Sequence, residues 1–287
     1  MRPEIVPFIS AMGWAVDSIM VRKGARTSSV LSAAFLSYLV TTVLTWSYVL
    51  LNFPLSIVRS PAAFYFMASG TLQPLLARIF LYIGIERLGV ARAMPLRGIG
   101  PLFSVAIAVV FLAERPVASV YLGGIFIVAG GWMVLYRKGS TKGDWRLLDA
   151  LYPIMAAFLA GVSQNFRKAG LLILPNPFVA GAITTGTSLT IFVVYLWIRR
   201  QFSEVIPSRE SVPYFVPTAF VSAISQLLVF TSLNLGDVSV MIPLLNTTPL
   251  FSLIFSAIFL RDLERITVPI VLGALSLLSG AVLITSR

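Results

Sequence analysis

Long apolar segments with almost no charged residues make up most of this 287-residue chain. A helix needs roughly 20 apolar residues to cross the hydrocarbon core of a bilayer. The segments run over residues 4–21, 29–51, 62–85, 90–113, 117–136, 147–166, 177–198, 212–233, 238–260 and 267–285. The sequence therefore predicts an all-α integral membrane protein with ten transmembrane helices.

Composition excludes several classes of function. Only 11% of the residues are charged, against about 25% in a typical soluble domain. The net charge of +11 would suggest nucleic acid in a soluble protein, but here it fits basic loops on a membrane surface. The chain has no Cys and no His, which are common metal ligands and, for His, the commonest general base. We therefore expect no metal, no cofactor, no enzymatic reaction and no nucleic-acid partner.

Two halves of the chain resemble each other. The pattern P-L-x4-P-L-F-S occurs at residues 95–104 and again at 243–252, which is 148 residues later. Arg22-Lys23 near the start of the first half matches Arg167-Lys168 in the second half. A run of such matches in the same order indicates an internal duplication.

The duplication predicts an inverted repeat. Residues 1–140 form the first five-helix repeat and residues 141–287 form the second. An odd number of spans makes the second repeat enter the membrane from the opposite side. This architecture is typical of secondary transporters, while a channel or a structural membrane protein is the rival interpretation.

With these two halves and the repeated Pro-Leu motif, the chain resembles the drug/metabolite transporter superfamily, specifically its ten-helix EamA-type branch. The resemblance covers nearly the whole chain and rests on the two halves and the repeated Pro-Leu motif. Ala113-Glu114-Arg115 fits the Gly-Glu-Arg-like turn of that family, whereas residues 261–265 fit it only with an insertion. The family moves amino acids, nucleotide sugars, phosphorylated sugars, nucleobases and drugs. The resemblance therefore implies transport and leaves the substrate open.

Polar residues within the apolar segments are the candidate site. Arg78 lies well inside the third segment, where a charge is costly and usually functional; the alternative is a side chain that extends to the membrane surface. Gln226 matches Arg78 at the 148-residue offset. The predicted substrate-binding residues are Arg78, Gln73, Tyr82, Arg97, Gln226 and Asn246.

Asp17 is the acidic residue that lies well inside a predicted span. Its carboxylate could pair with Arg78 or bind a proton or a cation, and a local pair with a nearby basic residue is the alternative. Proline removes a backbone hydrogen bond inside a helix and frees a carbonyl. The predicted helix kinks lie at Pro95, Pro101, Pro243 and Pro249, with static kinks that only help packing as the alternative.

These features predict a secondary-active or facilitative transporter, either an exporter or an exchanger, of small polar metabolites such as amino acids. Because Arg78 and Arg97 face few acids, we expect a substrate with an anionic group. The alternative function is a membrane enzyme or a protein that handles lipid head groups without solute flux. We expect a multi-pass monomer or homodimer in the bilayer of a prokaryotic cell (inner) membrane.

Basic residues predict the orientation of the chain. Fourteen Lys and Arg residues fall in the loops after odd-numbered spans, six fall on the other side, and two lie inside spans. The positive-inside rule then places both termini outside. The family that the chain resembles usually has both termini inside.

Overall fold

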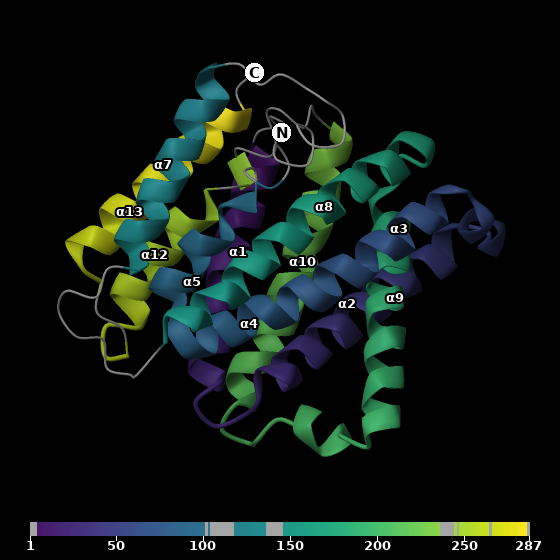
Figure 1. Cartoon of the computed structure of the whole chain (residues 1–287). Helices are drawn as coiled ribbons and strands as arrows, with labels where there is room; N and C mark the ends of the chain where they lie inside the picture. Colours follow the sequence, from purple (N-terminus) through teal and green to yellow (C-terminus); the bar gives the residue numbers. More distant parts are fainter. Residues whose placement is uncertain are drawn as a thin grey trace.

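The computed structural model describes residues 5–100, 103, 118–135, 146–235, 244–245, 247–263 and 266–285. These residues form helices with short connections and no strand (Figure 1). Six of the described helical segments are long and apolar enough to cross a membrane, and three shorter helices are also apolar. The prediction of a multi-pass helical membrane protein is therefore confirmed for the described residues.

The described helices are divided between the two halves of the chain. The first half contains α1 (Ile5–Gly24), α2 (Val30–Asn52), η1 (Leu55–Arg59), α3 (Ala62–Gly70), η2 (Thr71–Leu76), α4 (Ala77–Leu88), α5 (Val90–Arg97) and α7 (Ala118–Leu135). The second half contains η3 (Leu147–Ala150), α8 (Leu151–Ile173), α9 (Pro177–Arg199), η4 (Phe202–Val205), α10 (Val212–Leu235), α12 (Thr248–Phe259) and α13 (Val268–Thr285).

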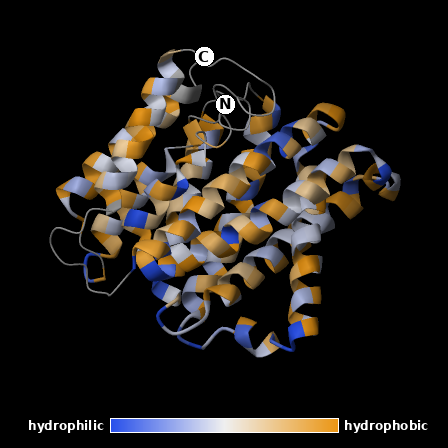
Figure 2. Cartoon of the chain, viewed as in Figure 1, coloured by the Kyte–Doolittle hydropathy of each residue, from blue (hydrophilic) through white to orange (hydrophobic). Residues whose placement is uncertain are grey.

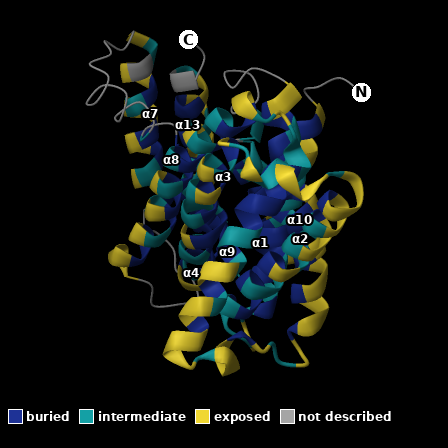
Figure 3. Cartoon of the chain, turned by 90° about the vertical axis from the view of Figure 1, so that its right-hand side faces the viewer, coloured by how far each residue is buried: buried dark blue, intermediate teal, exposed yellow. Residues whose placement is uncertain are grey.

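The outer surface of the helices is rich in large apolar residues, unlike that of a soluble protein. Many large apolar residues are exposed, and Leu51 and Trp197 are 85% and 72% exposed. Figure 2 shows the hydrophobic residues along the helices, and Figure 3 shows which parts of the helices are exposed. Charged side chains, among them Asp17, Arg78 and Arg167, are buried between the helices. Soluble proteins almost never bury such charges without partners. An apolar exterior, with charged groups kept between the helices, is what a lipid solvent favours.

Local sequence explains where two of the spanning helices begin. The Oγ of Ser29 accepts a hydrogen bond from the N–H of Leu31 at the start of α2. The side chain of Asn176 accepts hydrogen bonds from two backbone N–H groups at the start of α9, and Pro177 is the first residue of that helix. Both arrangements satisfy N–H groups that have no partner within the helix.

The third predicted span is interrupted rather than continuous. Between α3 and α4 the chain forms the wider turn η2, and Gln73 within it has extended backbone angles (φ −146°, ψ 124°). Pro74 follows and has no N–H to donate, so the helical hydrogen bonds cannot continue through this point. The break leaves backbone carbonyls inside the membrane that need other partners.

The predicted end of the sixth span is wrong. We expected it to end at residue 166, with Arg167 and Lys168 in a loop, but α8 continues to Ile173. Arg167 is only 1% exposed within that helix. A hydropathy profile treats an arginine as the end of a span, whereas here neighbouring groups stabilise its charge inside the bundle.

The prolines differ in their positions. Pro95 lies inside α5, and a kink at this position stays a prediction. Pro249 lies at the start of α12, where its missing N–H removes no helical hydrogen bond, so it marks a helix start rather than a bend within a continuous helix. Pro101 and Pro243 lie outside the described residues.

Helices α7 and α13 pack side by side at unusually short range (Figure 1). A Cβ atom added to Gly130 would lie 2.6 Å from the carbonyl oxygen of Gly273, and one added to Gly280 would lie 2.5 Å from that of Gly123. The two pairings run in opposite directions along the helices, so the pair is antiparallel. Small residues allow this close approach of helices in lipid.

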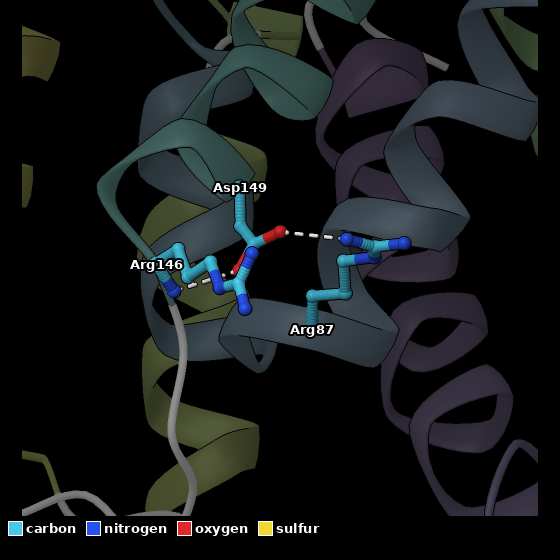
Figure 4. Close-up of polar contacts among 3 residues, drawn as sticks. All are labelled: Arg87, Arg146 and Asp149. Carbon is cyan, nitrogen blue, oxygen red and sulfur yellow. Dashed lines mark hydrogen bonds and ion pairs between the residues drawn. The ribbon is translucent and has the colours of Figure 1, made fainter.

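An ion pair joins α4 to the segment that opens the second half (Figure 4). Nη1 of Arg87 lies 2.8 Å from Oδ1 of Asp149, and Oδ2 of Asp149 accepts a hydrogen bond from the backbone N–H of Arg146. The Arg87 guanidinium also lies 4.9 Å from the ring centre of Tyr152. The Arg87 side chain is half exposed, so this pair orients the connection more than it stabilises the fold.

The glycine packing gives a test with a control on the adjacent residue. Gly130→Ala should lower the melting temperature of the detergent-solubilised protein, because overpacking costs about 1–3 kcal/mol. Gly131→Ala should leave it nearly unchanged, because a Cβ at Gly131 would meet no atom within 4 Å. Equal melting temperatures of the two variants, measured by thermal unfolding, would contradict the close packing of α7 on α13.

Candidate functional site

Side chains from the second half of the chain bind backbone carbonyls at the break between α3 and α4. Ser188 of α9 donates a hydrogen bond from Oγ to the carbonyl of Gly70 at 2.8 Å. Arg167 of α8 donates from Nη2 to the carbonyl of Gln73 at 3.1 Å. Two carbonyls at the break are thus paired inside the bundle, as the bilayer requires.

A tyrosine of α2 binds two further backbone carbonyls at the break. The hydroxyl of Tyr38 lies 3.0 Å and 2.9 Å from the carbonyl oxygens of Pro74 and Leu75, to which it donates. Tyr38 is fully buried. Its ring therefore has a fixed position beside the break.

Arg78 is stacked between aromatic rings one turn beyond the break. Its guanidinium carbon lies 4.9 Å from the ring centre of Trp14 and 5.4 Å from that of Tyr38. The residue is 6% exposed, so it does not extend to the membrane surface. Among the interactions of the described residues, no hydrogen bond involves this guanidinium. Cation–π contacts hold the cation and leave its N–H groups available.

Asp17 and Tyr82 form a direct contact beside Arg78. The Tyr82 hydroxyl lies 3.1 Å and 3.0 Å from the two carboxylate oxygens of Asp17, which is 1% exposed. The positive charge of Arg78 stabilises the negative charge of this carboxylate. Arg22, the nearest basic residue in sequence, instead donates to backbone carbonyls at the end of α4. Asp17 thus belongs to the interior cluster rather than to a local pair.

Arg167 is the functional candidate that sequence reasoning missed. Its Nε donates to Oγ of Ser69 at 3.1 Å, and its guanidinium carbon lies 4.9 Å from the ring centre of Phe230. Ser69 is in turn 2.9 Å from Oγ of Ser163. The signal available in the sequence was the match of Arg167-Lys168 to Arg22-Lys23, followed by the apolar residues that continue α8.

Three glutamine side chains carry buried atoms without a partner among the described residues. These atoms are Nε2 of Gln226, Oε1 of Gln73 and Oε1 of Gln164. Gln226 lies one turn before Phe230 in α10, and Gln164 lies one turn before Arg167 in α8. Buried polar atoms are nearly always hydrogen-bonded. Their position beside Arg167 fits a site that a polar ligand completes.

The remaining predicted site residues have different outcomes. Arg97 is the last residue of α5 and is half-buried. Its positive charge acts unfavourably on the positive charge of Arg167. Among the described residues, the Arg97 guanidinium makes no hydrogen bond. Asn246 lies outside the described residues. In the part of the chain that the structure describes, no group of three acidic side chains could hold a metal.

A separate cavity of about 480 Å³ lies between α2, η1, α3 and α9. Its wall is mostly apolar and includes Trp46, Met67 and Thr187. None of the predicted site residues contributes to it. The polar cluster around Asp17, Arg78 and Arg167 is therefore the candidate functional site.

Comparison with known proteins identifies the family of the chain. The model of the EamA-like transporter family matches residues 2–136 and residues 147–286. An uncharacterized transporter of Archaeoglobus fulgidus is 22% identical over 275 residues, which cover 94% of this chain and 92% of the relative. A crystal structure whose description names no function shares the fold, with a TM-score of 0.67 at 13% identity over 98% of this chain and 95% of the other. Because the family model matches nearly all of its length, the chain belongs to the EamA-like transporter family.

Proposed function

We propose that the chain is a secondary transporter of small polar metabolites that carry an anionic group, with amino acids as the favoured class. It acts as an exporter or exchanger in a prokaryotic cell membrane. The observation that carries this proposal is the buried Arg78 guanidinium, which is stacked on two rings but engaged in no hydrogen bond among the described residues. Membership of a transporter family supports flux rather than catalysis.

The charge balance of the cluster supports an anionic group. The cluster holds the buried arginines Arg78 and Arg167 and the half-buried Arg97, against the single carboxyl group of Asp17. Taking uncompensated charge out of water costs several kcal/mol per ion. A guanidinium also presents paired N–H donors that match a carboxylate or a phosphate. An anionic substrate would supply both the charge and the missing acceptors.

The glutamines support a substrate that has more than an anionic group. Oε1 of Gln73 and Oε1 of Gln164 need donors, and Nε2 of Gln226 needs an acceptor. An amino or hydroxyl group on the substrate would provide such donors. A site with buried polar groups rejects analogues that leave those groups unpaired. This favours an amino acid or a hydroxylated acid over a simple carboxylate.

Helix pairing supports two inverted repeats, residues 1–140 and 141–287. Helix α1 packs on α10, and its counterpart α8 packs on α3 and α4. Helix α2 packs on its counterpart α9, and α7 packs on its counterpart α13. An internal two-fold axis would produce this set of pairs. The two separate matches of the family model agree with it, and alternating access then follows as one repeat moves against the other.

Asp17 is the proposed point of coupling, if the protein couples transport to an ion at all. Its carboxylate is bound by Tyr82 and balances the charge of Arg78. An anionic substrate that reaches Arg78 competes with Asp17 for that charge. Binding of a proton or cation at Asp17 would relieve this competition. The rest of the cluster offers no chain of acids, so facilitated diffusion or exchange is the simpler mode.

A binding and uptake experiment tests the substrate class. Amino acids and other anionic metabolites, but not cationic drugs, should raise the melting temperature of the purified protein, because a ligand stabilises the folded state. Arg78→Ala should raise the ligand concentration needed for the same stabilisation roughly 10- to 100-fold, since hydrogen bonds to charged groups contribute about 1.5–3 kcal/mol. Uptake into proteoliposomes should fall in parallel, and Arg78→Lys should restore it poorly.

The control variant is Arg87→Ala, which removes an arginine that is half exposed at the end of α4. It should leave ligand affinity unchanged. Full uptake by a folded Arg78→Ala variant would remove the anionic-substrate proposal, and so would stabilisation by cationic compounds alone. A protein that binds ligand but carries out no uptake or exchange in proteoliposomes would count against transport itself.

A second experiment tests Asp17. If Asp17 couples transport to protons, Asp17→Asn should abolish the pH dependence of uptake while ligand binding persists. Tyr82→Phe removes the hydrogen bonds but keeps the carboxylate, so it should shift the pH dependence without abolishing it. An Asp17→Asn variant with the rate and pH profile of the unaltered protein would eliminate the coupling role.

A further inference from the structure

Two contacts between a glycine and a phenylalanine ring recur in the structure with nearly the same geometry. A Cβ atom added to Gly24 of α1 would lie 2.3, 2.7 and 3.0 Å from Cε1, Cδ1 and Cζ of Phe215 in α10. A Cβ atom added to Gly170 of α8 would lie 2.4, 2.8 and 2.9 Å from the same three atoms of Phe66 in α3. We name these the Gly24 contact and the Gly170 contact.

The two contacts involve matching parts of the two halves. Gly24 follows Arg22-Lys23, and Gly170 follows Arg167-Lys168 after one extra residue. Each phenylalanine directly follows a tyrosine near the start of its helix, in Tyr65-Phe66 and in Tyr214-Phe215. The helix pairs that carry them, α1 with α10 and α8 with α3, also correspond between the halves.

The contacts lie at opposite ends of the bundle. The end of α1 meets the start of α10 at the bottom of the view, whereas the end of α8 meets the start of α3 at the upper right (Figure 1). Gly24 lies two turns beyond Asp17 along α1, and Gly170 lies one turn beyond Arg167 along α8. Each contact therefore lies between the polar cluster and one end of the bundle.

We propose that the Gly24 contact and the Gly170 contact are the two gates of the transport pathway, both closed in this structure, which open in alternation. This inference rests on the proposed transport function. Both phenylalanines are fully buried, so their rings have little room to retreat. Glycine at each position allows a backbone to lie directly on the ring, and any Cβ would hold the gate apart.

The two gates differ in what surrounds them. Beside the Gly24 contact, Oγ of Ser28 accepts hydrogen bonds from the N–H of Ser208 and from Oγ of Ser211, at 2.7 and 2.8 Å. Around the Gly170 contact, Phe66 belongs to an apolar cluster with Leu171 and Val179. Phe215 likewise belongs to an apolar cluster, with Val21 and Val205. Opening either gate therefore exposes apolar surface, and opening the first gate also requires water to replace hydrogen bonds.

Accessibility of a single cysteine tests the gates, because the chain has no cysteine of its own. Gln226→Cys places a thiol in the cluster, where the side chain is 1% exposed. A membrane-impermeant maleimide is then applied from either side of oriented vesicles. Gly24→Ala should raise the labelling rate from one side and Gly170→Ala from the opposite side. We expect roughly a tenfold rise, since overpacking of this size shifts an equilibrium by about a decade.

Matched variants separate gate opening from general damage. Gly131→Ala adds the same methyl group where nothing lies within 4 Å, so labelling should not change. Phe215→Leu removes the ring and should open the same side as Gly24→Ala. Adding Gly24→Ala to Phe215→Leu should then have little further effect, because the obstructing ring is gone.

The outcomes distinguish this inference from the proposed transport function. Labelling from the same side by both glycine variants, or no change in variants with an unaltered size-exclusion profile, would overturn the gates even if uptake is observed. Labelling from opposite sides would support the gates even if no solute is taken up, and the missing flux would then count against transport alone.

Discussion

Every backbone carbonyl inside a bilayer must find its partner within the protein, and the break between α3 and α4 shows how this chain meets that requirement. Four carbonyls around η2, those of Gly70, Gln73, Pro74 and Leu75, accept hydrogen bonds from side chains, and the carbonyl of Pro74 also accepts one from the backbone N–H of Ala77. The partners come from α2, α8 and α9. An irregular segment in the third span is therefore stable only because helices from both halves surround it.

The same side chains that close the break also build the candidate site. The hydroxyl of Tyr38 binds the carbonyls at the break, while its ring lies against Arg78. Arg167 uses one nitrogen for the carbonyl of Gln73 and another for Ser69. Structure and site are thus coupled, because the residues that stabilise the break also fix the positions of the guanidinium groups.

Much of the fold could be predicted because hydropathy reports directly on the lipid solvent. The apolar segments, the multi-pass architecture and the interior role of Arg78 and Asp17 follow from that one property. The break at η2 did not follow, since a single Pro74 is equally compatible with a simple kink. Arg167 was missed because a profile averaged along the chain cannot see Ser69 or Phe230 on other helices. Partners across helices depend on the three-dimensional packing, as the contact of Tyr82 with Asp17 also shows.

The break has a consequence for how the protein is made. Tyr38 precedes η2 in the chain, so its hydroxyl is present as soon as the third span enters the membrane. Arg167 and Ser188, which bind the carbonyls of Gln73 and Gly70, are synthesised about a hundred residues later, which takes roughly 5–20 s at ordinary translation rates. During that interval these two carbonyls require water or the insertion machinery as a temporary partner. The first half of the chain therefore reaches its final conformation only after α8 and α9 have been inserted beside it.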